Sequence, residues 1–281
     1  MRKTLSYIIK SILKNPNLIG WGVLFILFWG VIGAYVSTPG EMNTLPESLS
    51  IVKSSVYTDI VSAWYAVLMI LFLSAIGVSL TFLVYFQSGA LPYLFKYSKL
   101  TPSKYLMSMF SGGTIAGIVL SLILTYAISG MFSTNGVGYT VMPTKPYVVF
   151  PVVILSFLFL ISLSFFLVLI SMKFGGVKYQ QLVNYIPLIL GFIFYSLYNF
   201  ASSYPEWVTY ASPYLNIISL LFYGYSGNKP PVTGASGINA PTVSVEWSAL
   251  FLTLWTIGLF LIDTVLLRKI NYEPIEEAKI M

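Results

Sequence analysis

Six long apolar runs, almost free of charge, constrain this chain more than any other feature of its sequence. Only 9% of its 281 residues are charged, 57% are hydrophobic, and the mean hydropathy is +0.83. A soluble globular domain carries about 25% charged residues, so water cannot be the solvent for most of this surface. Because a helix needs about 20 apolar residues to cross a bilayer, the chain has room for one membrane domain of about six spans.

The predicted fold is therefore an all-α polytopic membrane protein with six transmembrane helices. Residues 1–16 are expected to form an amphipathic helix in the membrane interface, with Leu5, Ile8 and Ile12 on its apolar face. The alternative is a plain basic flank of the first span. The six-span membrane domain is expected to occupy residues 17–281, with spans at about 18–37, 60–86, 105–131, 147–172, 181–201 and 245–267.

Lysine and arginine residues predict the orientation, because the cytoplasmic loops of membrane proteins are enriched in them. Twelve of the fifteen basic residues fall on the side that holds both termini, and only Lys53, Lys145 and Lys229 fall on the other. We therefore expect a multi-pass protein of the cell (plasma) membrane, in contact with lipids, with both termini cytoplasmic. The net charge of +6 follows from this bias, and no nucleic-acid partner is expected.

Missing residue types exclude several kinds of chemistry. The sequence has no Cys and no His, which removes thiolate nucleophiles, Cys-ligated metals and the usual general base. No G-x-x-x-x-G-K-[ST] loop occurs, so the chain does not bind ATP by that route. Glu41, Glu47 and Asp59 would suit a membrane glycosyltransferase in principle, but scattered outer acids are usually just solvated. We expect no enzymatic activity, metal or cofactor in this chain.

The last external connection, at about 202–244, is too long for a simple turn. Its part 207–222 is apolar enough to be buried in the membrane, yet Pro213 interrupts it. Two short helices that dip into the outer leaflet fit better than a seventh span, which would invert the C-terminus. We therefore predict a re-entrant helical segment between the fifth and sixth spans, followed by a Gly/Pro/Asn-rich coil at 224–241.

Polar and small residues share one face of the second span and one face of the fifth. Such faces are either helix-packing surfaces or the lining of a pathway, and both interpretations remain open here. A lining rich in tyrosine and free of charge would suit an amphipathic or sugar-like solute. The candidate pathway or dimer-face residues are Ser74, Thr81 and Tyr85 in the second span and Asn184, Tyr195, Tyr198 and Asn199 in the fifth.

Asp263 is the one charged residue placed in the interior of a predicted span, away from its ends. It precedes Arg268 by five residues, which is about 7–8 Å along a helix. It is either a carboxylate near the inner headgroups that pairs with Arg268 or Lys269, or an interhelical or proton-linked site. In the third span, small residues at Gly113 and Gly117 predict a close helix contact.

The stretch 87–104 lies between two spans and holds three lysines, two prolines and no acid. Gly89, followed by Leu94-Phe95 and by Leu100-Thr-Pro-Ser-Lys-Tyr105, is similar to the G…L-L…sP-x-s-x-x-y loop of the ABC-2 type permease family. Residues 204–221 are similar to that family's lP-x-W-l…l-s/n-P-l…l segment, and the order of parts resembles the family throughout. The chain departs from it at Gln87 and Ser88, where the family often has an acidic pair.

The resemblance implies a non-catalytic permease subunit of a prokaryotic ABC exporter. Such subunits form homodimers or heterodimers, and a separate cytoplasmic ABC ATPase, which holds the ATP and Mg, drives them. The second and fifth spans would then face the partner permease. The residues implied for ATPase coupling are Gly89, Leu91, Tyr93, Leu94, Phe95, Lys96, Lys99 and Pro102, and those for an outer gate are Trp207, Pro213 and Asn216.

Two other interpretations remain. The chain would otherwise be a non-transporting structural subunit of a larger membrane complex, or an ATP-independent carrier. Within 87–104, Thr101 and Pro102 are the predicted cap and first turn of the third span, which confines any docking helix to about 91–99.

Overall fold

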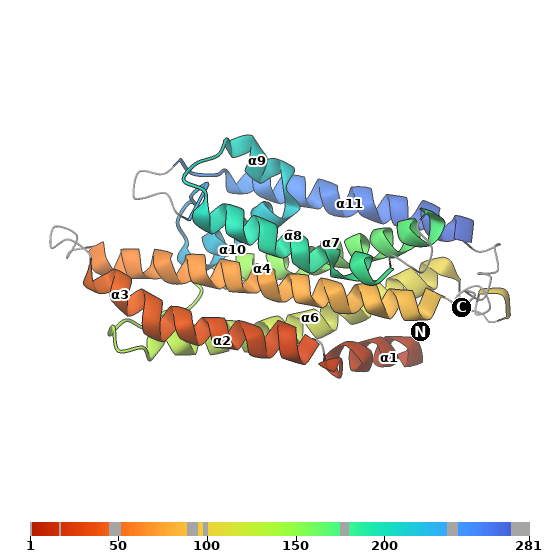
Figure 1. Cartoon of the computed structure of the whole chain (residues 1–281), viewed down its shortest axis with the longest axis horizontal. Helices are drawn as coiled ribbons and strands as arrows, with labels where there is room; N and C mark the ends of the chain where they lie inside the picture. Colours follow the sequence, from red (N-terminus) through yellow and green to blue (C-terminus); the bar gives the residue numbers. More distant parts are fainter. Residues whose placement is uncertain are drawn as a thin grey trace.

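The computed structural model is a bundle of long helices that run roughly side by side (Figure 1). It describes residues 2–16, 18–44, 52–88, 95–97, 101–174, 180–234 and 241–270. Within these ranges the chain is helical apart from turns, and its one β feature is an isolated bridge between Pro231 and Thr242. The predicted all-α fold is confirmed.

Six helices are long and apolar enough to cross a membrane, as predicted. The first, Leu18–Asn43, is continuous, and two π-helical segments, η1 (Leu18–Leu24) and η2 (Gly33–Ser37), alternate in it with α2 (Phe25–Ile32) and α3 (Thr38–Asn43). Several helices run past the apolar limits expected from the sequence, because a helix continues where its side chains turn polar. The other five are α4 (Lys53–Ser88), α6 (Pro102–Ser133), α7 (Pro146–Phe174), α8 (Gln180–Phe200) and α11 (Val245–Ile270).

Helix α4 lies at the centre of the bundle. Of the residues in its most apolar 18-residue stretch, 89% are buried within the chain. The corresponding share is 29% for the first spanning helix and 28% for α11. It packs against α7 and α8, and against the shorter α10 (Pro213–Ser226). Because α4 is buried on nearly all sides, it is the element around which the others are arranged.

Helix α1 (Arg2–Leu13) lies along α6. Ile8 and Ile12, two of the residues on its expected apolar face, are buried. The contact is close because Gly112 of α6 has no side chain: a Cβ placed there would lie 2.9 Å from Cγ2 of Ile8. The apolar face of α1 is therefore used for packing on α6.

Residues 206–226 form two short helices that meet at Ser212 and Pro213. The first, α9 (Glu206–Ala211), is followed directly by α10, whose first turn contains the proline. The Ser212 hydroxyl caps α10 by accepting a hydrogen bond from the backbone N–H of Leu215 at 3.3 Å. Almost all of α10 is buried, and it packs against α4, α7 and α11.

The two ends of the bundle differ in charge. At one end lie α1 and the C-terminal ends of α4 and α11; at the other lie α3, α9 and the N-terminal ends of α4 and α11 (Figure 1). We call these the α1 end and the α9 end. Among the described side chains, the acids outside the middle of the bundle, Glu41, Asp59, Glu206 and Glu246, belong to elements at the α9 end.

Candidate functional site

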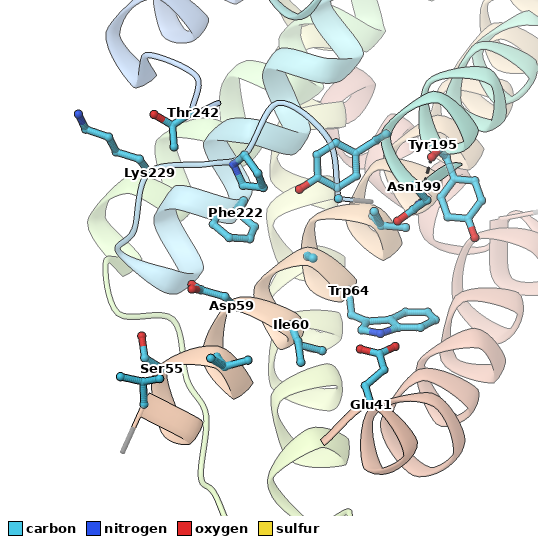
Figure 2. A pocket seen from close by; sticks show the side chains of 17 residues that line it. Glu41, Ser55, Asp59, Ile60, Trp64, Tyr195, Asn199, Phe222, Lys229 and Thr242 are labelled. Atoms are coloured by element: carbon cyan, nitrogen blue, oxygen red, sulfur yellow. Dashed lines mark hydrogen bonds between the residues drawn. The ribbon is translucent and has the colours of Figure 1, made fainter. Parts of the chain in front are cut away.

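A cavity of about 610 Å³ lies at the α9 end of the bundle. Its walls come from α3, α4, α8 and α10, and from residues 229–234 and Thr242 (Figure 2). It combines aromatic rings with polar and charged groups. The lining residues with chemical interest are Glu41, Asp59, Trp64, Tyr195, Tyr198, Asn199, Phe222 and Lys229.

The indole of Trp64 forms one wall of this cavity. It lies against Gly33 of the first spanning helix, where an added Cβ would be 2.8 Å from Cδ2 of the indole. The carboxylate of Glu41 lies beside the same ring, and Tyr195 projects from α8 on the same side (Figure 2). Glycine at position 33 thus lets the indole pack closely on the first spanning helix.

Asp59 supplies the second carboxylate. Its Oδ1 accepts a hydrogen bond from Nδ2 of Asn228 at 2.8 Å, which fastens the following coil to α4. Lys229 is exposed and points away from Glu41 and Trp64 (Figure 2). The acids in the cavity are therefore not neutralised by an ion pair among the described residues.

Tyr198 is the most buried aromatic residue of the lining, with 1% of its surface exposed. Its hydroxyl has no hydrogen-bond partner in the described part of the chain. Its backbone carbonyl accepts from the N–H of Gly234 at 2.8 Å, and this bond holds the coil over the end of α8. A buried hydroxyl of this kind is able to bond a water molecule or a polar atom of a ligand.

A second tether holds the same coil. The hydroxyl of Tyr204, on the connection from α8 to α9, donates to the carbonyl of Val232. Burial raises the pKa of Tyr204 to about 12, so this hydroxyl remains a donor throughout the physiological range. The cavity therefore has a wall that is bonded to α4 at one point and to the α8–α9 region at two.

The predicted pathway residues divide into two groups. Tyr195, Tyr198 and Asn199 line the cavity. Ser74 and Thr81 are instead buried in α4, and their hydroxyls donate to the carbonyls of Ile70 at 2.6 Å and Gly77 at 2.7 Å. For these two residues the geometry is that of helix packing within the chain. Neither Asn184, which is buried, nor Tyr85 lines the cavity.

Sequence reasoning treated Glu41 and Asp59 as scattered acids and did not identify the cavity. Its charged and aromatic residues come from four separate parts of the chain, so no motif links them. The available signal was topological: the predicted spans bring Glu41, Asp59, Tyr198 and Lys229 to the same side of the membrane.

At the α1 end, the described turn at 95–97 is held by an aromatic contact. The ring of Phe95 meets that of Tyr105 on α6 edge to face, with centroids 6.1 Å apart, and Tyr105 meets Phe165 of α7 in the same way at 6.0 Å. Lys96 and Tyr97 are exposed beyond this contact. Of the other coupling residues predicted, Gly89, Leu91, Tyr93, Leu94 and Lys99 lie outside the described residues, and Pro102 begins α6.

The residues predicted for an outer gate lie on α9 and α10. Trp207 is 66% exposed, whereas Asn216 is fully buried and donates from Nδ2 to the carbonyl of Tyr210 at 3.0 Å. Pro213 occupies the first turn of α10. The pair of helices thus has an exposed aromatic tip and a buried, hydrogen-bonded base.

Asp263 is fully buried in α11. Neither carboxylate oxygen has a hydrogen-bond partner among the described residues, and the side chains of Arg268 and Lys269 lie outside that part of the structure. Burying a carboxylate without a hydrogen-bond partner is energetically costly, so the environment of Asp263 is unusual.

Comparisons of the chain with protein-family models, curated proteins and solved structures found no match. The two ends of the bundle are therefore interpreted from their own geometry.

Proposed function

We propose that this protein is the membrane-spanning permease subunit of an ABC exporter and that a separate cytoplasmic ATPase drives it. The observation that carries the proposal is the turn at 95–97, where an anchored aromatic residue is followed by an exposed lysine and tyrosine. Six helices suited to crossing a membrane support it, as does the absence of an ATP-binding loop from the whole sequence. Such a chain needs an external source of energy.

The proposed mechanism begins where the ATPase docks on Lys96 and Tyr97. Movement of the turn would pull on Phe95, whose ring contacts Tyr105 of α6. Because Tyr105 contacts Phe165 of α7, the displacement would reach two spanning helices through packed rings. Packed side chains with discrete arrangements can carry such coupling. The loop 87–104 as a whole is the proposed docking region.

In this proposal the α1 end is cytoplasmic and the membrane is the cell membrane. The described lysines Lys10, Lys14, Lys96 and Lys104 belong to elements at that end and agree with the positive-inside rule. Helix α1 would lie at the inner headgroups while packed on α6. Helices α9 and α10 would form the re-entrant segment, with Trp207, Pro213 and Asn216 at an outer gate.

A second permease chain, identical or different, completes the proposed transporter. Helix α8 is a suitable contact surface, because only 22% of its most apolar 18-residue stretch is buried within the chain. Its polar residues Tyr195 and Asn199 also reach the cavity, so a pathway near α8 would connect the two features. The cavity's aromatic and polar walls fit an amphipathic, lipid-like or glycan-like substrate.

The test starts from native membranes, where the tagged chain should retain a P-loop ATPase in stoichiometric amount. In liposomes containing both proteins, we expect Lys96→Glu and Phe95→Ala to lower permease-stimulated ATP hydrolysis. Lys53→Glu, a matched charge reversal at the α9 end, should leave it unchanged. Normal stimulation by both variants, or the absence of any ATPase, would contradict the proposal and favour a structural subunit.

One observation favours a second candidate, an ATP-independent proton-linked carrier. Asp263 is a fully buried carboxylate without a described partner, and such groups mark proton relays in transporters. In that case solute flux would continue without an ATPase, and Asp263→Asn would abolish it. Flux that survives this substitution excludes the proton-linked carrier.

A further inference from the structure

We propose that the cavity at the α9 end binds an organic cation, namely an amine or onium ion with an apolar body. The inference concerns binding by this chain alone and holds whether or not an ATPase drives it. It rests on the charges, aromatic rings and buried hydroxyl that converge on the cavity.

The charges of the lining favour a cation. Glu41 and Asp59 contribute two carboxylates, and neither forms an ion pair among the described residues. Lys229 contributes the one ammonium of the lining, but it points away from Glu41 in Figure 2 and interacts electrostatically with Glu246 of α11. The region around Glu41 is therefore negative, and an anionic ligand would be repelled there.

The aromatic residues give the site its chemical class. A cation within about 6 Å of a tryptophan face is attracted by the ring quadrupole, and onium ligands are typically held this way. Trp64 offers its indole on the side where Glu41 lies in Figure 2, and Tyr195 lines the same cavity from α8. A bound onium group would meet a negative charge and an aromatic face together, whereas a metal ion would make no use of the apolar walls.

Tyr198 is independent evidence that the cavity receives a ligand. It is 1% exposed and lines the cavity, yet its hydroxyl is unpartnered in the described chain. Leaving a buried polar group unsatisfied is costly, and a ligand's polar atom would remove that cost. Beyond it, the ring of Phe222 provides apolar wall for the body of the ligand.

The size of the cavity limits the ligand to a small organic molecule. Sites for such molecules are typically about 300–1,000 Å³, and this cavity of about 610 Å³ lies within that range. An inorganic cation would leave most of the volume and the apolar wall unused.

The binding test uses the full-length chain, purified without an ATPase in a neutral polyoxyethylene detergent. Equilibrium dialysis with radiolabelled tetraphenylphosphonium should show saturable binding that benzyltrimethylammonium displaces. Benzenesulfonate and maltose should not displace it. Absence of saturable binding, or displacement by maltose or benzenesulfonate, overturns the assignment to an organic cation.

Substitutions then locate the site. Glu41→Gln should weaken the binding about tenfold, because the ligand's positive charge loses its carboxylate partner in a partly enclosed site. Trp64→Leu should weaken it roughly 3- to 30-fold through loss of the cation–π contact. Glu206→Gln, which neutralises an exposed acid of α9 outside the cavity, is the matched control and should bind as the wild type does.

Folding of each variant is checked by its size-exclusion profile and thermal unfolding. If Trp64→Leu does not fold, Trp64→Phe and Glu41→Gln provide the decision, since the first keeps an aromatic ring and the second changes an exposed residue. Wild-type affinity in a folded Glu41→Gln variant overturns the proposal. Because no ATPase is present, this outcome is separate from a failure of the permease proposal.

Discussion

Gly117 of α6 lies directly against the ring of Phe157 on α7. A Cβ added to the glycine would fall 2.1 Å from Cζ of the phenylalanine, which is fully buried. One turn earlier, Gly113 is similarly close to Ile161, at 2.7 Å from its Cδ1. The small residues at 113 and 117 therefore give the close helix contact expected from their spacing, and the contact is made within the chain.

This contact predicts that Gly117→Ala destabilises the protein. Overpacking a tight interface costs about 1–3 kcal/mol, and the ring of Phe157 has to move to admit the methyl group. Gly130→Ala is the matched control on the same helix, because nothing lies within 4 Å of its added Cβ. Thermal unfolding in detergent should show a lower midpoint for Gly117→Ala, and an unchanged or higher one for Gly130→Ala. Equal midpoints would contradict the packing described here.

A hydrogen bond from the hydroxyl of Tyr105 holds the C-terminal end of α4. The hydroxyl donates to Oε1 of Gln87 at 2.5 Å and so joins the last turn of α4 to the first turn of α6. A hydrogen bond of this kind contributes about 0.5–1.5 kcal/mol. Tyr105→Phe should therefore speed amide hydrogen exchange in that turn of α4 by up to about tenfold.

Tyr97→Phe is the control for this experiment. It removes a tyrosine hydroxyl from the same end of the molecule, but that residue is 74% exposed. Exchange near Gln87 should be unaffected by it. Faster exchange in both variants would mean that the effect is not due to the bond between Tyr105 and Gln87.

Substitution of Asp263 should have an unusual effect on stability. Its carboxylate oxygens are buried without a partner among the described residues, so the isosteric amide replaces an ionisable group whose charged form is costly to bury. Asp263→Asn should be at least as stable as the wild type in thermal unfolding. Asp59→Ala should be less stable, because Nδ2 of Asn228 loses the acceptor that Oδ1 of Asp59 provides. A marked loss of stability in Asp263→Asn would show that the acid has a stabilising partner.

Features that depend on neighbouring residues in the sequence were predictable. Apolar runs identified the six candidate spans, because hydropathy is a local property. The Thr101-Pro102 pair was identified as a helix start, and Oγ1 of Thr101 accepts from the N–H of Lys104 at 3.3 Å. Ser212-Pro213 is a helix-start signal of the same kind. In the sequence Pro213 indicates only an interruption of the apolar segment, although Ser212 also caps α10.

Features that depend on which helices become neighbours were not predictable. Several runs are similarly apolar, and nothing local indicates that α4, rather than α7, occupies the centre. The cavity is a stronger case, because Glu41 and Trp64 line it from different helices, and the indole also packs closely on Gly33. Each of these residues has an ordinary alternative interpretation, and their combination arises only from tertiary structure.

The final prediction concerns whether the polar faces of α4 and α8 pack against each other. A Cβ on Gly191 of α8 would lie 2.3 Å from Oγ and 2.7 Å from Cβ of Ser74 on α4. Gly191→Ala should therefore lower the midpoint of thermal unfolding, and the double variant Ser74→Gly/Gly191→Ala should recover part of the loss, because the side chain in the way is gone. Residues in contact give interaction energies of about 0.5–3 kcal/mol in such cycles. Additive effects would instead mean that Ser74 and Gly191 are not neighbours. The polar face of α8 would then be free to contact the second permease chain proposed above.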